Sequence, residues 1–144
     1  MIFKSTIFFL GRLCFSSTFI LSGVYNIIKW EEKEQSLINA MLDFLSYGYE
    51  WEFIQKWFDF LLPWVSQILM GITILQILGG LLILLGIQMR FGALLLCLVL
   101  IPLTILFHPF WFLQGEAKNL QLTAFLNSLS VFGASLMILS KRPQ

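Results

Sequence analysis

Charge is scarce in this sequence, and so are the residues that most often carry chemistry. Of the 144 residues, 12% are Asp, Glu, Lys or Arg, which is about half the share found in soluble globular domains. There is one histidine, His108. The two cysteines, Cys14 and Cys97, lack the spacing of a metal site or a Cys-x-x-Cys pair. We therefore expect no metal site, no intrinsic cofactor and no nucleic-acid partner. No catalytic motif indicates whether the chain is an enzyme.

Apolar residues, by contrast, make up 58% of the chain, above the roughly 45–50% that is usual in globular domains. A soluble domain of this size cannot bury so much apolar surface, because small domains bury only part of what they contain. The surplus must face lipid. This predicts an integral membrane protein with a single domain over residues 1–144.

Four apolar stretches are long enough to cross the roughly 30 Å hydrocarbon core of a bilayer, which takes about 20 helical residues. They are residues 5–28, 63–87, 91–112 and 120–140. The runs are continuous rather than alternating, which favours helices over a barrel. The first run has features of a signal peptide, but Arg12 interrupts it and no small-x-small site follows, so we expect it to stay as the first span. The predicted fold class is an all-α membrane protein, a bundle of four transmembrane helices.

The distribution of charge predicts which side of the membrane each loop faces. An even number of spans puts both termini and the 88–90 turn on one side, which carries no acid. Its five cations are Lys4, Arg12, Arg90, Lys141 and Arg142. All eight acids lie on the other side, in residues 29–62 and 113–119. By the positive-inside rule we expect both termini in the cytoplasm, in a bacterial cytoplasmic (inner) membrane.

The connection between the first two spans, residues 31–62, is expected on the outer face. Its apolar residues recur at helical spacing, as in Leu37, Met41 and Leu45, which predicts short amphipathic helices on the outer leaflet. All five tryptophans fall on this predicted outer side, where amphipathic rings favour the interface. The alternative is an ordered connection that covers no site.

Each predicted span carries one stripe of polar or small residues when it is read at 3.6 residues per turn. From the first span to the fourth, the stripes are Arg12/Ser16/Phe19/Gly23/Asn26, Ser66/Thr73/Gln76/Gly80, Cys97/Thr104/His108 and Thr123/Asn127/Ser130/Ala134. Small residues let helices approach, and amides and hydroxyls hydrogen-bond between them. We therefore expect the stripes to face one another inside the bundle. The glycines expected to make helix contacts are Gly23, Gly79, Gly80 and Gly86.

The polar residues of these stripes predict a pocket that opens outward beneath the aromatic segment. At about 1.5 Å of rise per residue, His108, Asn26 and Asn127 fall in the outer part of the membrane, and Gln76 falls near its middle. The candidate ligand-binding residues are His108, Asn127, Asn26, Gln76 and Thr104.

His108 has two interpretations. In the structural one, Pro109 frees carbonyl groups near Thr104, and the imidazole satisfies them with Asn127 completing the hydrogen bonds. In the functional one, the ring binds a ligand or relays protons, because imidazole titrates near neutrality.

Several segments of the chain have a familiar order and spacing. The segment "GRLCFSSTFILSGVYNIIKW" contains an arginine near its start and a small-Gly pair, Ser22 and Gly23, near its end. The segment "LQILGGLLILLGIQMR" is a glycine-rich helix closing on Arg90. A third region, "ILFHPFWF" followed by "FLNSLSVFGASLMI", combines a histidine after the third span with an Asn-Leu-x-x-x-Gly fourth span. Together these segments resemble the DoxX family of small four-span membrane proteins.

The resemblance also identifies three departures and implies a range of functions. Gln76 and Asn26 occupy positions where family members often carry a glutamate and a lysine, and Leu126 stands before Asn127 where they often carry a lysine. Some members belong to thiosulfate:quinone oxidoreductase systems or to complexes that handle thiol and oxidative stress. We therefore expect an accessory subunit of a membrane redox system, with a quinone or another apolar ligand in the outward pocket.

Two other functions stay open. The first is a non-catalytic scaffold or adaptor that docks a protein partner through residues 31–62. The second is a small transporter, which would need to oligomerise because four spans are few. The partners expected are membrane lipid and either a protein at the outer face or further copies of the chain.

Overall fold

The computed structural model describes residues 2–47 and 50–140 of the chain, and these residues form helices without any strand. The helices are α1 (Ile2–Ile28), α2 (Trp30–Tyr47), α3 (Glu52–Leu61), η1 (Leu62–Trp64), α4 (Val65–Leu85), α5 (Met89–Phe107), η2 (Phe110–Phe112) and α6 (Gly115–Ser140). Lys141 and Arg142, which contributed to the charge argument, lie outside the described residues.

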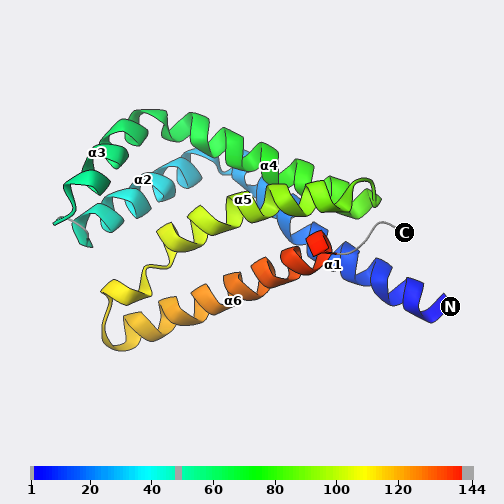
Figure 1. Cartoon of the computed structure of the whole chain (residues 1–144). Coiled ribbons are helices and arrows are strands. Elements are labelled where there is room, and N and C mark those ends of the chain that lie inside the picture. The colour runs from blue at the N-terminus through cyan, green and yellow to red at the C-terminus, as the bar shows by residue number, and fades with distance from the viewer. Residues whose placement is uncertain (1, 48–49, 141–144) are drawn as a thin grey trace.

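Four helical stretches are long and apolar enough to cross a membrane: Ser5–Ile28, Glu52–Leu85, Met89–Phe112 and Gly115–Ser140. The protein is an integral membrane protein. The predicted fold class is confirmed, with four spanning helices and short helices between the first span and the second. The second stretch joins α3, η1 and α4, and Pro63 lies in the 3-10 turn η1 between them. Because proline has no amide hydrogen, the regular helix is interrupted here and α3 is set at an angle to α4 (Figure 1).

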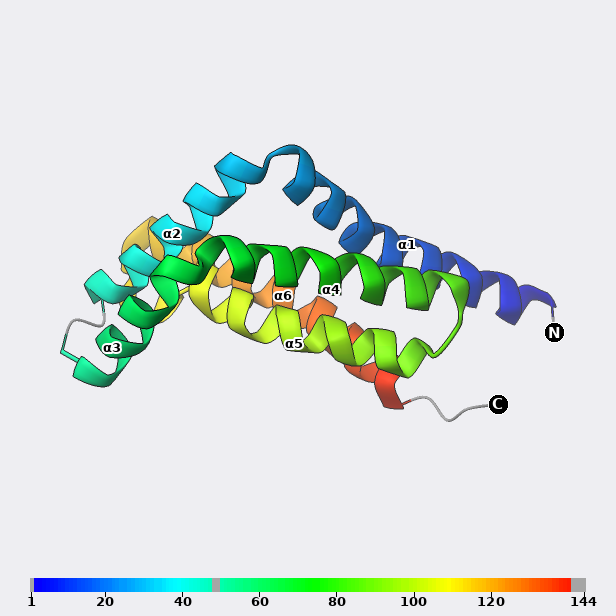
Figure 2. The ribbon, with the colours of Figure 1, turned by 90° about the horizontal axis from the view of Figure 1, so that it is seen from above.

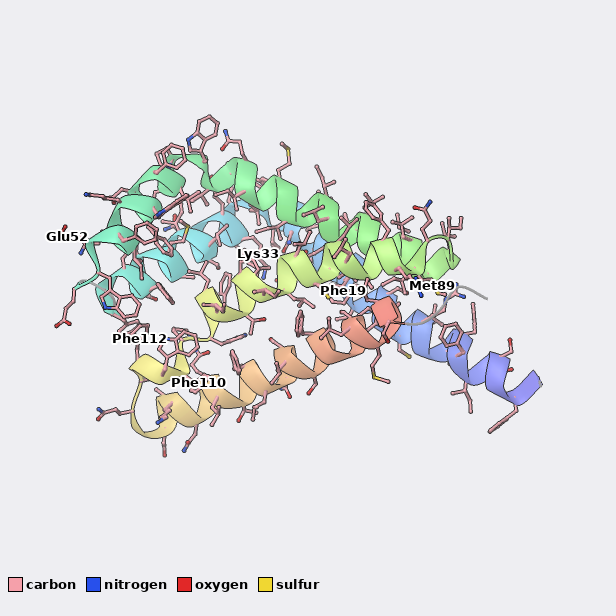
Figure 3. All side chains as sticks on the ribbon, in the orientation of Figure 1. Phe19, Lys33, Glu52, Met89, Phe110 and Phe112 are labelled. Carbon is pink, nitrogen blue, oxygen red and sulfur yellow. The ribbon has the colours of Figure 1, made fainter. Side chains whose placement is uncertain are left out.

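The spans run back and forth, so the connections gather at two ends of the molecule (Figure 1). The start of α1, the α4–α5 turn and the last turn of α6 lie at one end, called here the terminal end. Helices α2, α3 and η2 lie at the other, called here the loop end. Figure 3 places Met89 at the terminal end and both Phe110 and Phe112 at the loop end.

The core of the terminal half contains residues from all four spans. Phe19 of α1, Ile83 of α4, and Ala93 and Leu96 of α5 are buried together. Helix α6 completes this core, because its partly buried Val131, Ile138 and Leu139 pack against the cluster. Figure 3 shows Phe19 within the bundle rather than on its surface.

In the loop half, α2 rather than α1 packs against α4 and α5. Figure 2 shows α1 diverging from α4 toward its C-terminal end, where the chain turns back into α2. Leu37 and Met41 of α2 are buried against Val65 and Leu69 of α4, with side chains of α5 packed around them. At the turn, Lys29 Nζ donates to Glu32 Oε1 at 2.8 Å, and this hydrogen bond raises the pKa of Lys29 above its usual value.

Glycines permit two close contacts between spans. A Cβ atom on Gly79 of α4 would lie 3.0 Å from the carbonyl oxygen of Gly92, and one on Gly92 would lie 2.8 Å from that of Gly79. Helices α4 and α5 therefore touch backbone to backbone at this level. Between α1 and α4, a Cβ atom on Gly80 would meet Ile20 of α1. A Cβ atom on Gly23 would meet Ile77 of α4.

Arg12, the single charged residue inside the first span, is hydrogen-bonded to the end of a neighbouring helix. Its Nε donates to the carbonyl oxygen of Ile83 at 3.0 Å, and its Nη2 donates to that of Leu84. These carbonyls belong to the last turn of α4, whose C-terminus carries partial negative charge and lacks helical partners. Gly86 follows in the left-handed conformation with φ of +76°, and a Cβ atom there would lie 2.7 Å from Nη2 of Arg12. The arginine thus caps α4 from a neighbouring span.

Candidate functional site

The predicted polar stripes of the first two spans meet, as their periodicity indicated. Ser16, Phe19, Gly23 and Asn26 of α1 are all buried. On α4, the buried positions include Leu69, Thr73, Gln76, Gly80 and Ile83. The spacing of three and four residues therefore identified the facing sides of both helices.

At the centre of this contact lies a buried pair of amides. Asn26 Nδ2 donates to Gln76 Oε1 at 3.1 Å and to Thr73 Oγ1 at 3.4 Å. Both amide side chains are 7% exposed and Thr73 is 3% exposed, so the group is closed to solvent and lipid. These are the two positions at which the resemblance to the DoxX family implies a lysine and a glutamate, and in this chain two neutral amides hydrogen-bond to each other there.

His108 lies at the other polar group, at the loop end between α5 and α6. It is the residue that ends α5, and its backbone amide donates to the carbonyl of Thr104 at 3.1 Å. Its ring Nδ1 is 2.9 Å from Gln121 Oε1. Because an amide oxygen only accepts, Nδ1 carries the hydrogen and donates. Gln121 is thereby held with its NH₂ group directed away from the imidazole.

The expectation that His108 meets Asn127 is wrong. Its partner is Gln121, and Asn127 is exposed on another face of α6. The whole predicted stripe of the fourth span is displaced: Thr123, Asn127 and Ser130 are exposed, whereas Ser135 is buried. Thr123 Oγ1 and Ser130 Oγ bond to carbonyls one turn back in their own helix, at 2.9 and 3.0 Å, so these hydroxyls need no partner from the bundle.

The predicted pocket is therefore two separate polar groups. Asn26 and Gln76 belong to the α1–α4 contact, and His108 belongs to the α5–α6 contact. Thr104 contributes its carbonyl to His108 and lines an apolar groove of about 170 Å³ between α5 and α6. The other residues that line this groove are Leu100, Ile101, Ile105, Phe125, Ser128, Leu129 and Phe132.

A cavity of about 290 Å³, called here the loop-end cavity, lies between α2 and the ends of α5 and α6. Helix α2 contributes Ser36, Asn39, Ala40, Asp43 and Tyr47. The other side is formed by Leu106, Phe107, Pro109, Leu113 and Gln121. The α2 residues follow helical spacing, so one face of this helix lines the cavity while the neighbouring face carries the buried Leu37 and Met41.

Contacts between aromatic rings connect the helices of the loop end beside this cavity. Phe112 of η2 stacks on Tyr47 with ring centroids 5.6 Å apart and meets Phe44 edge-on at 5.8 Å. Phe44 in turn stacks on Phe58 of α3 at 5.7 Å. These rings link α2, α3 and η2. Of these three elements α2 lines the cavity, so the ring contacts hold one wall of the cavity in place.

Gln121 and the polar residues of α2 were not among the candidate residues drawn from the sequence. Gln121 lies on the face of α6 opposite the stripe that attracted attention, and nothing local distinguishes it from other glutamines. Ser36, Asn39 and Asp43 looked like the solvated face of an amphipathic helix. Only the packing of α2 against α5 turns that face toward a cavity.

The cysteines are free, with Cys14 exposed and Cys97 buried. Within the part of the chain that the structure describes, no three His, Cys, Asp or Glu side chains come together in a way that could hold a metal ion. The polar groups available at the loop-end cavity are amides, hydroxyls and one carboxylate. Such a set can donate and accept hydrogen bonds.

Comparison with known proteins gives one match. The DoxX family model matches residues 7–109, which is more than half of the chain and covers α1 to the end of α5. No curated protein and no solved structure matches the chain. The matched segment includes the amide pair and His108, and it ends before α6.

Proposed function

The chain belongs to the DoxX family of integral membrane proteins, and from that premise we propose that it is an accessory subunit of a membrane redox system. In this proposal, a quinone or another apolar ligand with a polar head occupies the loop-end cavity. The observation that supports it is the mixed lining of this cavity, to which α2 and Gln121 contribute polar groups, and the end of α5 and the segment after it contribute apolar side chains.

The lining suits a flat ring that carries carbonyl oxygens. Carbonyl oxygens accept hydrogen bonds, and Asn39, Gln121 and Ser36 provide NH₂ and OH donors. Leu106 and Phe107 provide apolar contact for the ring. The volume of about 290 Å³ is near the lower end of the range for small-molecule sites and fits a head group rather than a whole isoprenoid quinone. An apolar tail would extend from the cavity into lipid.

His108 acts in this proposal as a positioning residue. Its hydrogen bond to Gln121 Oε1 keeps the amide NH₂ of Gln121 free to donate to the ligand. Reducing a quinone to a quinol takes two electrons and two protons. The electrons come from a partner oxidoreductase subunit and the two protons from water at the loop end, while this chain binds and orients the quinone.

The proposal also includes the orientation expected from the charges. The loop end faces outward and both termini lie in the cytoplasm of a bacterial cell, in its cytoplasmic membrane. All eight acids of the sequence then lie on the outer side, while five of the nine cations lie on the inner side, which carries no acid.

The first test is mass spectrometry of lipids and quinones extracted from gently purified protein. We expect one defined quinone or amphiphile at close to one per chain. In Gln121→Ala the retained amount should fall about two- to tenfold, the equivalent of one lost hydrogen bond. Gln67→Ala is the matched control, because Gln67 is an exposed glutamine near the loop end of α4. The proposal is wrong if wild type and both variants retain no defined ligand.

His108→Ala separates the two interpretations of the histidine. As a positioning residue, its loss lowers ligand retention while the thermal stability of ligand-free protein in detergent changes little. As a purely structural link between α5 and α6, its loss lowers stability by about 1–3 kcal/mol and leaves ligand retention per folded chain unchanged.

A second candidate function is a scaffold that docks a protein at the loop end. The observation that favours it is the exposed acidic start of α2, where Glu31 and Glu32 face solvent. Replacing Glu31, Glu32 and Glu34 by glutamine should then release a co-purifying partner, while Gln121→Ala leaves that partner bound. The opposite outcome supports the ligand-binding subunit.

A further inference from the structure

One face of α6 is polar through the middle of the membrane span and is largely exposed among the described residues, while Val131 and Ile138 at its edge pack against the core of the terminal half. Thr123, Asn127 and Ser130 are exposed on this face, and Leu120 and Met137 at its ends are 72% and 75% exposed. The opposite face, with Gln121, Phe125 and Ser135, packs toward α5. Asn127 lies about 18 Å from the first residue of the 26-residue helix and therefore within the hydrocarbon core.

Asn127 differs from its polar neighbours on this face. The hydroxyls of Thr123 and Ser130 are satisfied by the carbonyls of Asn119 and Leu126. The Asn127 amide makes no hydrogen bond within the part of the chain that the structure describes. An amide in hydrocarbon without a partner is costly, so intramembrane asparagines face a protein partner rather than lipid. The side chain requires a group outside this chain that both donates and accepts.

The spacing of the face is that of a helix-packing seam. Residues 120, 123, 127, 130, 134 and 137 alternate at intervals of three and four, which is the a/d pattern of two helices wound around each other. Threonine, serine and alanine at 123, 130 and 134 are small enough for close approach. We call residues 120, 123, 127, 130, 134 and 137 the α6 seam.

We infer that the α6 seam is the interface with a second copy of this chain, paired in parallel about a two-fold axis. Copies inserted in the same orientation place their Asn127 side chains at the same depth. An amide has both a donor and an acceptor, so two such side chains satisfy each other. The seam reaches water at Glu116, where screening weakens the repulsion between the two carboxylates. This interface does not depend on the loop-end cavity.

Disulfide scanning in native membranes tests the inference. In a Cys14→Ser/Cys97→Ser background of the full chain, single cysteines are placed along residues 119–137 and oxidised. Cross-linked dimer should peak at 123, 127, 130 and 134. Leu129→Cys and Leu136→Cys are the controls, because Leu129 (48% exposed) and Leu136 (43% exposed) lie on the surface of α6 but outside the seam. Equal cross-linking at all exposed positions, or none, overturns the proposal. Cross-linking of the seam to a different membrane protein also overturns it.

A second measurement tests how much the Asn127 side chain contributes to dimerisation. Energy transfer between labelled copies in phosphatidylcholine vesicles reports the dimer fraction as the protein is diluted in lipid. Asn127→Leu should weaken dimerisation about three- to tenfold, the range for one interhelical hydrogen bond in a membrane. Leu129→Ala should leave it unchanged. A dimer constant that Asn127→Leu does not change, or strengthens, contradicts a pairing through this amide.

Discussion

At the scale of the residue, polar side chains within the spans fall into three groups. Some bond to their own helix, as Ser130 does with Leu126. Others bond to a neighbouring span, as Asn26 does with Gln76, and as Arg12 does with the end of α4. Asn127 does neither. The second group determines which helix faces touch, because an amide or guanidinium in hydrocarbon must be satisfied.

The Asn26–Gln76 hydrogen bond should be a measurable part of the α1–α4 contact. Asn26→Leu leaves Gln76 buried without its donor, and we expect a loss of about 1–2 kcal/mol in the free energy of unfolding in detergent. Gln76→Met should cost a similar amount, because it leaves the amide of Asn26 with only the weaker contact to Thr73. The double variant should lose less than the sum of the two single variants, because neither amide is then left unpaired. Additive losses would show that the two amides do not interact.

At the scale of the element, α2 is one of the short amphipathic helices that the sequence predicted, but its apolar face packs on the bundle rather than in the lipid leaflet. An amphipathic helix on the leaflet surface should have one apolar face in lipid and one polar face in water. Instead, α2 packs Leu37 and Met41 into the core of the loop half and directs its polar face toward the loop-end cavity. The helix α3, which has no buried residue, fits the original expectation better.

The packing of α2 can be tested with two leucines of the same helix. Leu37 is 3% exposed, and Leu37→Ala should lower the free energy of unfolding by about 2–5 kcal/mol, as for large-to-small changes in a core. Leu42 is 47% exposed, and Leu42→Ala should change it by less than about 0.5 kcal/mol. Protease cleavage within residues 30–61 provides a local readout. Equal sensitivity of the two variants would mean that α2 is not docked.

At the scale of the whole molecule, four spans place the start of α1 and the α4–α5 turn at the same end, opposite to α2, α3 and η2 (Figure 1). The loop end carries the acids and the exposed indole rings of Trp51, Trp57, Trp64 and Trp111. Aromatic rings of this kind favour the membrane interface, which is consistent with the loop end lying at one surface of the bilayer.

The orientation of the chain in the membrane can be measured by labelling each end of the molecule separately. In a Cys14→Ser/Cys97→Ser background, Gln88→Cys marks the α4–α5 turn and Glu52→Cys marks the start of α3. A membrane-impermeant maleimide added to intact cells should label Glu52→Cys and not Gln88→Cys, and both should react after the membrane is opened. The reverse pattern would invert the topology proposed from the charges.

The sequence by itself determined the features that depend on local composition. Continuous apolar runs require spanning helices, because the backbone has no other way to satisfy its polar groups in lipid. The number of spans and their alternating direction follow. The facing sides of α1 and α4 were also predictable, since Ser16, Asn26, Thr73 and Gln76 repeat at helical intervals and bulky apolar residues fill the other faces.

The tertiary structure decided what periodicity leaves ambiguous. The α6 stripe of Thr123, Asn127 and Ser130 resembles an inward face, yet Gln121 and Ser135 face α5 instead. Hydroxyl groups that bond to their own helix can face either way, so their spacing does not reveal the inner side. The polar face of α2 likewise looked like a face for water alone, whereas in the structure it lines the loop-end cavity beside the ends of α5 and α6. In both cases the choice depends on which partners a side chain finds after the helices pack, and this is not encoded in any one segment.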